Sequence, residues 1–288
     1  MYWFTLMIPV VLVVAFTTWL PERIIRPRRR TVNLDPRDLG FAFESLELTT
    51  PEGVALAAFY VPATIPARGN LVLLHGKDSA KELYLEYLPQ LVPFGYNLLL
   101  YDARGHGRSQ GEFTTFGYHE WQDAVTAAKH LRHLGGDLPT GVFGHSMGGA
   151  VALQTMARSV AIEFGIVESA FTHLGDITYR YARRQSGLPL PRWLTDRILD
   201  RAEKIARFRH REVEPVRAAR SVSQPTLIIH GEDDRQIDVD NGRQLYAALG
   251  SVHKELYIIP RAGHDNITEV GADGYWWRLR AFLASVTG

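Results

Sequence analysis

Residues 140–156 have the sequence TGVFGHSMGGAVALQTM, which contains the pattern Gly-x-Ser-x-Gly from Gly144 to Gly148. The apolar pair Val142-Phe143 precedes this pattern and the apolar run 150–156 follows it, so the motif is predicted at a turn from a strand into a helix. Such a sharp turn strains the backbone and needs small neighbours, which glycine provides. It exposes the serine hydroxyl and directs N–H groups of the helix start toward developing negative charge. The stretch therefore predicts that Ser146 is a nucleophile.

Around this motif, apolar strands alternate with segments of helical spacing. The predicted strands are 70–74, 96–101, 141–144, 164–167, 226–229 and 254–259, and the predicted helices are 81–92, 118–134, 150–159, 241–249 and 275–285. Residues 44–49 and 54–61 precede them and predict an antiparallel hairpin with its turn at Pro51-Glu52-Gly53. The alternation predicts an α/β fold, a mostly parallel sheet with helices on both faces.

One long segment, at about residues 171–222, interrupts the alternation. It contains three prolines and carries twelve Lys or Arg against six Asp or Glu. A helical insert over the carboxyl edge of the sheet would fit, because ligands bind at that edge. Its charges have two interpretations: a solvated helix face, or a cap that forms the substrate pocket near anionic lipid headgroups.

Two further segments contain potential catalytic side chains just after predicted strands. Asp233 and Asp234 follow the strand 226–229 through His230-Gly231, and His264 follows the strand 254–259. The carboxyl ends of parallel strands meet at one edge of the sheet, so either aspartate could reach His264. Together with Ser146, they predict a serine, histidine and carboxylate constellation.

Two further loops that contain glycine follow predicted strands and are expected at the same edge of the sheet. His75-Gly76 ends the strand 70–74, and the loop after that strand supplies an oxyanion donor in this architecture, so the backbone N–H groups of Lys77 and Met147 are the predicted donors. Residues 102–109, DARGHGRS, do not have the spacing of a phosphate-binding loop. We expect them to form a structural turn with an Asp–Arg contact.

Taken together, these motifs resemble a known group of enzymes. They are His75-Gly76, Asp102-x-Arg104-Gly105-His106-Gly107-x-Ser109, Gly144-His145-Ser146-Met147-Gly148-Gly149, His230-Gly231-x-x-Asp234 and Gly263-His264. From about Glu44 to the C-terminus, the chain resembles lipase/serine-aminopeptidase-like α/β-hydrolases. Within that group it is similar to membrane-anchored members with a short cap, which include acyl-protein thioesterases and lysophospholipid or monoacylglycerol lipases. The order Ser146, Asp, His264 is also that of α/β-hydrolases.

The resemblance implies a hydrolytic activity and selects one of the two candidate acids. In that group the acid is the fifth position of His-Gly-x-x-Asp, which selects Asp234 over Asp233. It implies cleavage of an acyl ester or thioester in a small molecule, a lipid or an acylated protein, without a metal or organic cofactor. Lys77-Asp78 departs from the pattern, because many relatives carry small or amide residues there.

Two other functions are compatible with parts of this sequence. An aminopeptidase would need an acidic anchor for the substrate amine, for which Glu168, Asp176 and the acids of residues 171–222 are candidates. A non-catalytic binding module would typically lack a member of the Ser146, Asp234 and His264 set. Serine in place of aspartate at position 146 excludes a haloalkane dehalogenase.

The N-terminus predicts a membrane anchor. Residues 2–20 contain no charged residue, and as a helix they would be roughly 28 Å long, close to the thickness of a bilayer core. A cleaved signal peptide fits poorly, because no basic segment precedes the run and no small-x-small site follows it. Five arginines between positions 23 and 30 favour a catalytic domain on the cytoplasmic side.

The expected organisation is an anchor with its basic flank at 1–30, a linker at 31–43 and a hydrolase domain at 44–288, with the cap insert at about 171–222. The formal net charge of +1 argues against a nucleic-acid partner. The chain has no cysteine, so disulfides and thiolate chemistry are excluded.

Overall fold

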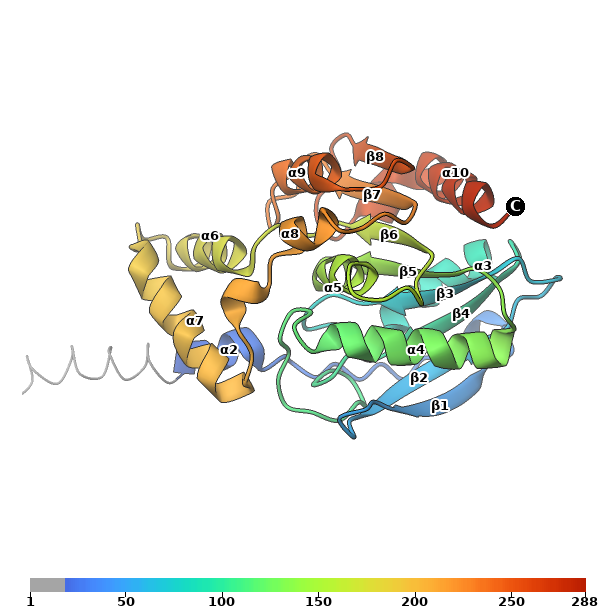
Figure 1. Cartoon of the computed structure of the whole chain (residues 1–288), viewed down its shortest axis with the longest axis horizontal. Helices are drawn as coiled ribbons and strands as arrows, with labels where there is room; N and C mark the ends of the chain where they lie inside the picture. Colours follow the sequence, from blue (N-terminus) through green and yellow to red (C-terminus); the bar gives the residue numbers. More distant parts are fainter. Residues whose placement is uncertain (1–18) are drawn as a thin grey trace, which may run out of the picture.

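The computed structural model describes residues 19–288. An eight-stranded sheet with the order β1-β2-β4-β3-β5-β6-β7-β8 forms the centre of the molecule (Figure 1). The strands are β1 (Glu44–Thr49), β2 (Ala55–Val61), β3 (Gly69–Leu74), β4 (Tyr96–Tyr101), β5 (Thr140–His145), β6 (Phe164–Glu168), β7 (Thr226–Gly231) and β8 (Lys254–Ile259). β1 and β2 pair antiparallel, and the six strands from β4 to β8 in the sheet order are parallel. The predicted hairpin and mostly parallel sheet are confirmed.

Helices cover both faces of this sheet (Figure 1). They are α2 (Leu20–Ile25), η2 (Pro36–Leu39), η3 (Lys81–Tyr87), α3 (Leu88–Leu91), α4 (Glu120–Gly135), α5 (Met147–Met156), α6 (Leu174–Ser186), α7 (Arg192–Ala206), η4 (His210–Glu212), α8 (Pro215–Ala219), α9 (Asp240–Ala248) and α10 (Ile267–Thr287). Residues of α4, α5 and α9 belong to one apolar core, and residues of α3 and α10 belong to the other. Successive strand residues alternate between the two cores, as Val72 and Leu73 do, because side chains in a strand point alternately to opposite faces.

The segment predicted as one helix over 81–92 differs in the structure. It forms the 3-10 helix η3 followed by the four-residue helix α3. Pro89 lies in the first turn of α3, where it has no N–H to continue the hydrogen-bond ladder from the preceding turn. The prediction of a continuous helix was therefore wrong.

The loop after β4 is a structural turn with an Asp–Arg contact, as predicted, and its aspartate also forms an ion pair that was not predicted. The carboxylate of Asp102 accepts the backbone N–H of Arg108 at 2.9 Å and pairs with Lys81 Nζ at 2.9 Å. Arg104 reaches away from the loop to Asp123, with Nη2 2.7 Å from Oδ1. Gly107 has φ of +44°, and a Cβ there would collide with the Asp102 carboxylate. The turn therefore encloses a buried lysine–aspartate pair.

The first described residues pack onto the sheet domain. Ile25 of α2 is fully buried and shares a core with Leu199 of α7. The guanidinium of Arg29 donates to the carbonyl oxygens of Gly107 at 3.0 Å and Ser109 at 2.6 Å. The basic flank therefore contacts the domain through specific hydrogen bonds.

The predicted membrane anchor lies almost wholly outside the described residues. Between residues 19 and 288, no helix combines the length and the apolar character needed to cross a bilayer.

Residues 171–222 form α6, α7, η4 and α8. Figure 1 shows α6 and α7 beyond one end of the sheet, with α2 beside α7. The buried side of α7 contains Ile198, Leu199 and Ala202. A large part of α6 is exposed, with only Leu174 and Thr178 buried. This pair of helices adjoins the carboxyl ends of the strands, where the candidate site lies.

Candidate active site

Ser146 occupies the sharp turn between β5 and α5. Its backbone has φ of +56° and ψ of −115°, a strained conformation for a residue with a side chain. A Cβ on Gly148 would collide with the carbonyl oxygen of Leu74, and one on Gly144 would collide with that of Gly148. The glycines of the motif are therefore required sterically, as the sequence predicted.

His264 follows β8 and faces the serine. Its Nε2 lies 3.0 Å from Ser146 Oγ, and its Nδ1 lies 2.7 Å from Asp234 Oδ2. The imidazole is 8% exposed, so it is shielded from most of the solvent. If Asp234 accepts the Nδ1 proton, Nε2 is left unprotonated and able to accept the serine proton.

Asp234 lies in the loop after β7 and its side chain is fully buried. Its Oδ1 accepts the backbone N–H groups of Gln236 and Ile237, each at 2.8 Å. Burial alone would raise the pKa of Asp234, but hydrogen bonds from His230, His264 and the backbone hold it well below its ordinary value. The carboxylate therefore stays charged beside the imidazole.

Asp233, the other candidate acid, is placed differently. Its side chain is exposed, and only its backbone N–H is bonded, to the carbonyl of Ala262 at 2.8 Å. The structure thus brings Ser146, Asp234 and His264 into one chain of hydrogen bonds and leaves Asp233 outside it.

The two predicted oxyanion donors lie on either side of the serine. Met147 begins α5, and Lys77 follows Gly76, where a Cβ would stand 3.4 Å from Ser146 Cβ. Within residues 19–288, the backbone N–H groups of Lys77 and Met147 donate no hydrogen bond. Both donors are therefore available to a ligand. The Lys77 side chain turns instead to Asp78, with its Nζ 3.1 Å from the carboxylate.

The side chain of His75 connects two loops at the carboxyl edge of the sheet. Its Nε2 accepts the backbone N–H of Ala103 at 3.0 Å, which ties the end of β3 to the end of β4. Burial is the main cause that lowers the pKa of His75, so the ring stays neutral, as an accepting nitrogen requires.

A buried group behind the serine was not predicted. His145 Nδ1 lies 2.8 Å from Glu168 Oε1, and the hydroxyl of Tyr275 donates to Glu168 Oε2 at 2.7 Å. Burial opposes a charged His145, but the hydrogen bond and attraction from Glu168 outweigh it, and the pKa of His145 is raised. These residues lie on β5, β6 and α10, so no sequence spacing connects them.

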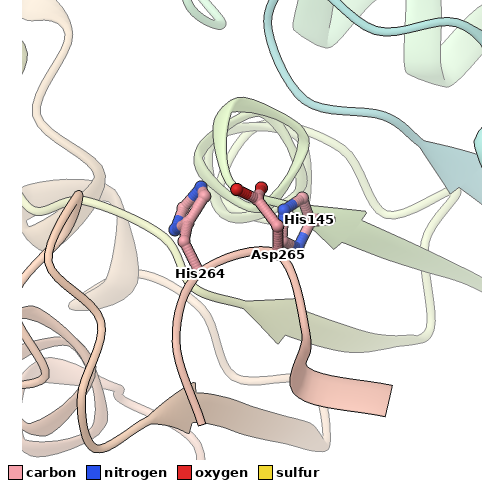
Figure 2. A group of neighbouring side chains, drawn as sticks. All are labelled: His145, His264 and Asp265. Carbon is pink, nitrogen blue, oxygen red and sulfur yellow. The ribbon is translucent and has the colours of Figure 1, made fainter. Parts of the chain in front are cut away.

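Among residues 19–288, His145, His264 and Asp265 form the group most similar to a metal site (Figure 2). Their potential ligand atoms lie within 4.8 Å of one another. Both nitrogens of His264 already face Asp234 and Ser146, however, and His145 Nδ1 faces Glu168. A metal ion here would have to displace the Ser146 and His264 contact, so we assign none to this group.

The parallel sheet, the turn at Ser146 and the flanking helices define an α/β-hydrolase of the lipase-like group. The chain belongs to the family described as serine aminopeptidase, S33, whose profile matches residues 65–179 and 205–271. The unmatched stretch from 180 to 204 contains the end of α6 and most of α7. Membership establishes a hydrolase but not the substrate.

Individual relatives agree with this assignment. The chain is 29% identical over 240 residues to the protein YqkD of Bacillus subtilis, covering 79% of this chain and 76% of that protein. It is 27% identical over 204 residues to the lysophosphatidylserine lipase ABHD12 of Macaca fascicularis, covering 66% of this chain and 47% of the lipase. An esterase of Pyrococcus furiosus superposes with a TM-score of 0.78 at 26% identity, covering 92% of this chain and 98% of the esterase.

Proposed function

We propose that this protein is a serine hydrolase that cleaves acyl ester or thioester bonds through Ser146, His264 and Asp234. The observation that carries the proposal is the continuous chain from Ser146 Oγ to His264 at 3.0 Å and from His264 to Asp234 at 2.7 Å. A non-catalytic binding module has no need of this aligned and buried arrangement. The strained backbone at Ser146 is a further feature that functional sites maintain.

In the proposed reaction, Ser146 Oγ attacks the acyl carbonyl carbon while His264 Nε2 takes the serine proton. The negative charge of Asp234 stabilises the resulting imidazolium. The backbone N–H groups of Lys77 and Met147 stabilise the tetrahedral oxyanion, and each such donor typically contributes about 3 kcal/mol to the transition state. His264 then gives the proton to the leaving group, and water hydrolyses the acyl-enzyme by the same route. No step requires a metal or an organic cofactor.

An ester or thioester is favoured over a peptide amine substrate. Glu168, a candidate anchor for a substrate amine, is buried and already holds His145 and Tyr275. Asp176 pairs with Arg192 through a short contact. The esterase and lipase named among the similar proteins also support a lipid-like acyl substrate.

A substrate panel tests this choice. We expect hydrolysis of p-nitrophenyl esters of graded chain length, measured by release of p-nitrophenol, and little hydrolysis of aminoacyl anilides. The reason is that the described site offers a nucleophile and an oxyanion hole but no free buried carboxylate for an amine. Faster cleavage of the anilides than of any ester would instead favour the aminopeptidase.

We further propose that the N-terminal segment anchors the protein in a membrane, with the catalytic domain on the cytoplasmic side. Residues 2–20 are uncharged and are followed by arginines, which favours that orientation. The end of the molecule that carries α2 and α7 exposes large apolar side chains, with Trp19 57%, Leu188 60% and Trp193 65% exposed. Tryptophan is typical of the membrane–water interface, so these residues support a domain lying against a bilayer with a cap over the site.

Carbonate extraction of membranes tests the anchor. We expect the full chain to stay in the pellet, because about 19 apolar residues are long enough to span the bilayer core. A truncated protein that begins at Trp19 keeps Ile25 in the core and Arg29 on its carbonyls, so it should stay in the supernatant and retain Ser146 reactivity. Extraction of the full chain by carbonate would refute the anchor.

A further inference from the structure

A polar pocket shares Asp234 with the candidate active site. Its volume is about 300 Å³, and it lies between α6 and the loop that follows β7. Three arginines line it, Arg180, Arg184 and Arg235, together with Tyr181, Asp234 and Asp238. Asp234 also contacts His264 Nδ1, so the pocket and the acid and histidine pair share this residue.

The positive charge of this pocket is poorly compensated. Arg180 approaches Asp238 only at 3.9 Å, and both side chains are more than half exposed, at 61% and 51%. Among residues 19–288, Arg184 and Arg235 form no ion pair. Arg184 instead donates to the backbone carbonyl of Arg235 at 2.5 Å, which holds α6 against the loop.

The negative charge of Asp234 compensates only one of these three arginines. Its carboxylate is fully buried and is already bonded to His264 and to two backbone N–H groups. Asp238 is the other carboxylate of the lining, so three guanidinium groups stand against two carboxylates, of which only Asp238 is exposed. Guanidinium groups bind phosphate and carboxylate through paired hydrogen bonds, which makes the pocket suited to an oxyanion.

We propose that this arginine pocket binds an oxyanion, a phosphate or a carboxylate, on the leaving group of the acyl substrate. The inference rests on the proposed function, in which His264 gives a proton to the leaving group. That group must therefore lie beside His264, and the pocket borders the loop that holds His264 in place. Arg180 and Arg184 lie in the stretch 180–204 that the family profile does not match, as expected of a specificity element.

Two esters with the same six-carbon acyl chain test the proposal on the full chain. One is hexanoyl glycerol 3-phosphate and the other is monohexanoylglycerol, so only the anionic group differs. We expect kcat/KM to be at least about tenfold higher for the phosphate ester, as for one charge-assisted hydrogen bond. Arg180→Gln and Arg235→Gln should each reduce that preference by about tenfold and leave the neutral ester unchanged.

The control is Arg201→Gln, which removes an exposed arginine of α7 outside the pocket lining. It should leave the preference unchanged, which separates a local site from general positive charge. Arg184 is not replaced, because its contact with the Arg235 carbonyl positions α6. A preference that persists in both Arg180→Gln and Arg235→Gln would overturn the arginine pocket while hydrolysis of the neutral ester still supports the proposed function.

A binding measurement makes the result independent of turnover. Ser146→Ala protein is titrated with hexanoyl glycerol 3-phosphate and with inorganic phosphate by calorimetry. The pocket is supported if the ester binds more tightly than inorganic phosphate and if Arg235→Gln weakens binding of the ester. This holds even if the wild-type enzyme hydrolyses neither ester and the proposed function fails. Equal affinity for inorganic phosphate would identify a free-phosphate site and overturn the leaving-group proposal.

Discussion

Replacing Ser146 with alanine should reduce kcat for an acyl ester by about 10⁶-fold, because the covalent step is lost while binding remains. The hydroxyl is the only group removed, and its oxygen lies 3.0 Å from His264 Nε2. A fluorophosphonate probe, which reacts with an activated serine, should label the wild-type protein and leave Ser146→Ala unlabelled.

The unusual backbone of position 146 is the reason for a folding control. Alanine keeps the Cβ but not the hydroxyl, so φ of +56° is as strained as before, and the circular dichroism spectrum and melting temperature should match the wild type. Undiminished labelling of a folded Ser146→Ala protein would show that another residue is the nucleophile.

Replacing Asp234 with asparagine should reduce kcat by about 10⁴-fold through the wrong histidine tautomer. The oxygen at the Oδ1 position is held by two backbone N–H groups, so the amide nitrogen must face His264 Nδ1. A nitrogen that donates there requires Nδ1 to be unprotonated, which moves the proton to Nε2. His264 then cannot accept the proton of Ser146.

Asp233→Asn is the matched control, with the same chemical change one residue away. The Asp233 side chain is exposed and makes no described contact with His264, so kcat should stay within about twofold of the wild type, as for a surface substitution. Steady-state kinetics on one p-nitrophenyl ester compare the two variants. A large loss in Asp233→Asn with normal activity in Asp234→Asn would reassign the acid.

Several features of the fold could be predicted because they depend on local sequence. The alternation of apolar strands and helical segments predicted the parallel sheet, and Pro51-Glu52-Gly53 predicted the hairpin turn. The helix expected over 81–92 failed because its apolar spacing says nothing about where Pro89 interrupts the hydrogen bonds. Periodicity indicates which face is buried, but not which backbone bonds close a turn.

The choice between the neighbouring acids could not be made from residue patterns alone. Both Asp233 and Asp234 follow the same strand, so strand order alone could not separate them, and the resemblance to a family selected Asp234. In the structure they differ in burial and in two backbone N–H groups that bond only Asp234. These donors exist only once the loop is folded.

The strand-to-helix turn at Ser146 followed from local residues alone, since its glycines are needed wherever that turn forms. The sequence also determined that an acid and His264 follow later strands, which places them at the same edge of the sheet. The tertiary structure was needed to show that Glu168 is occupied by His145 and Tyr275, and that Arg184 of α6 contacts the Arg235 carbonyl in the loop of Asp234. Those contacts join residues far apart in the chain, and their existence depends on how whole elements pack, which no local pattern encodes.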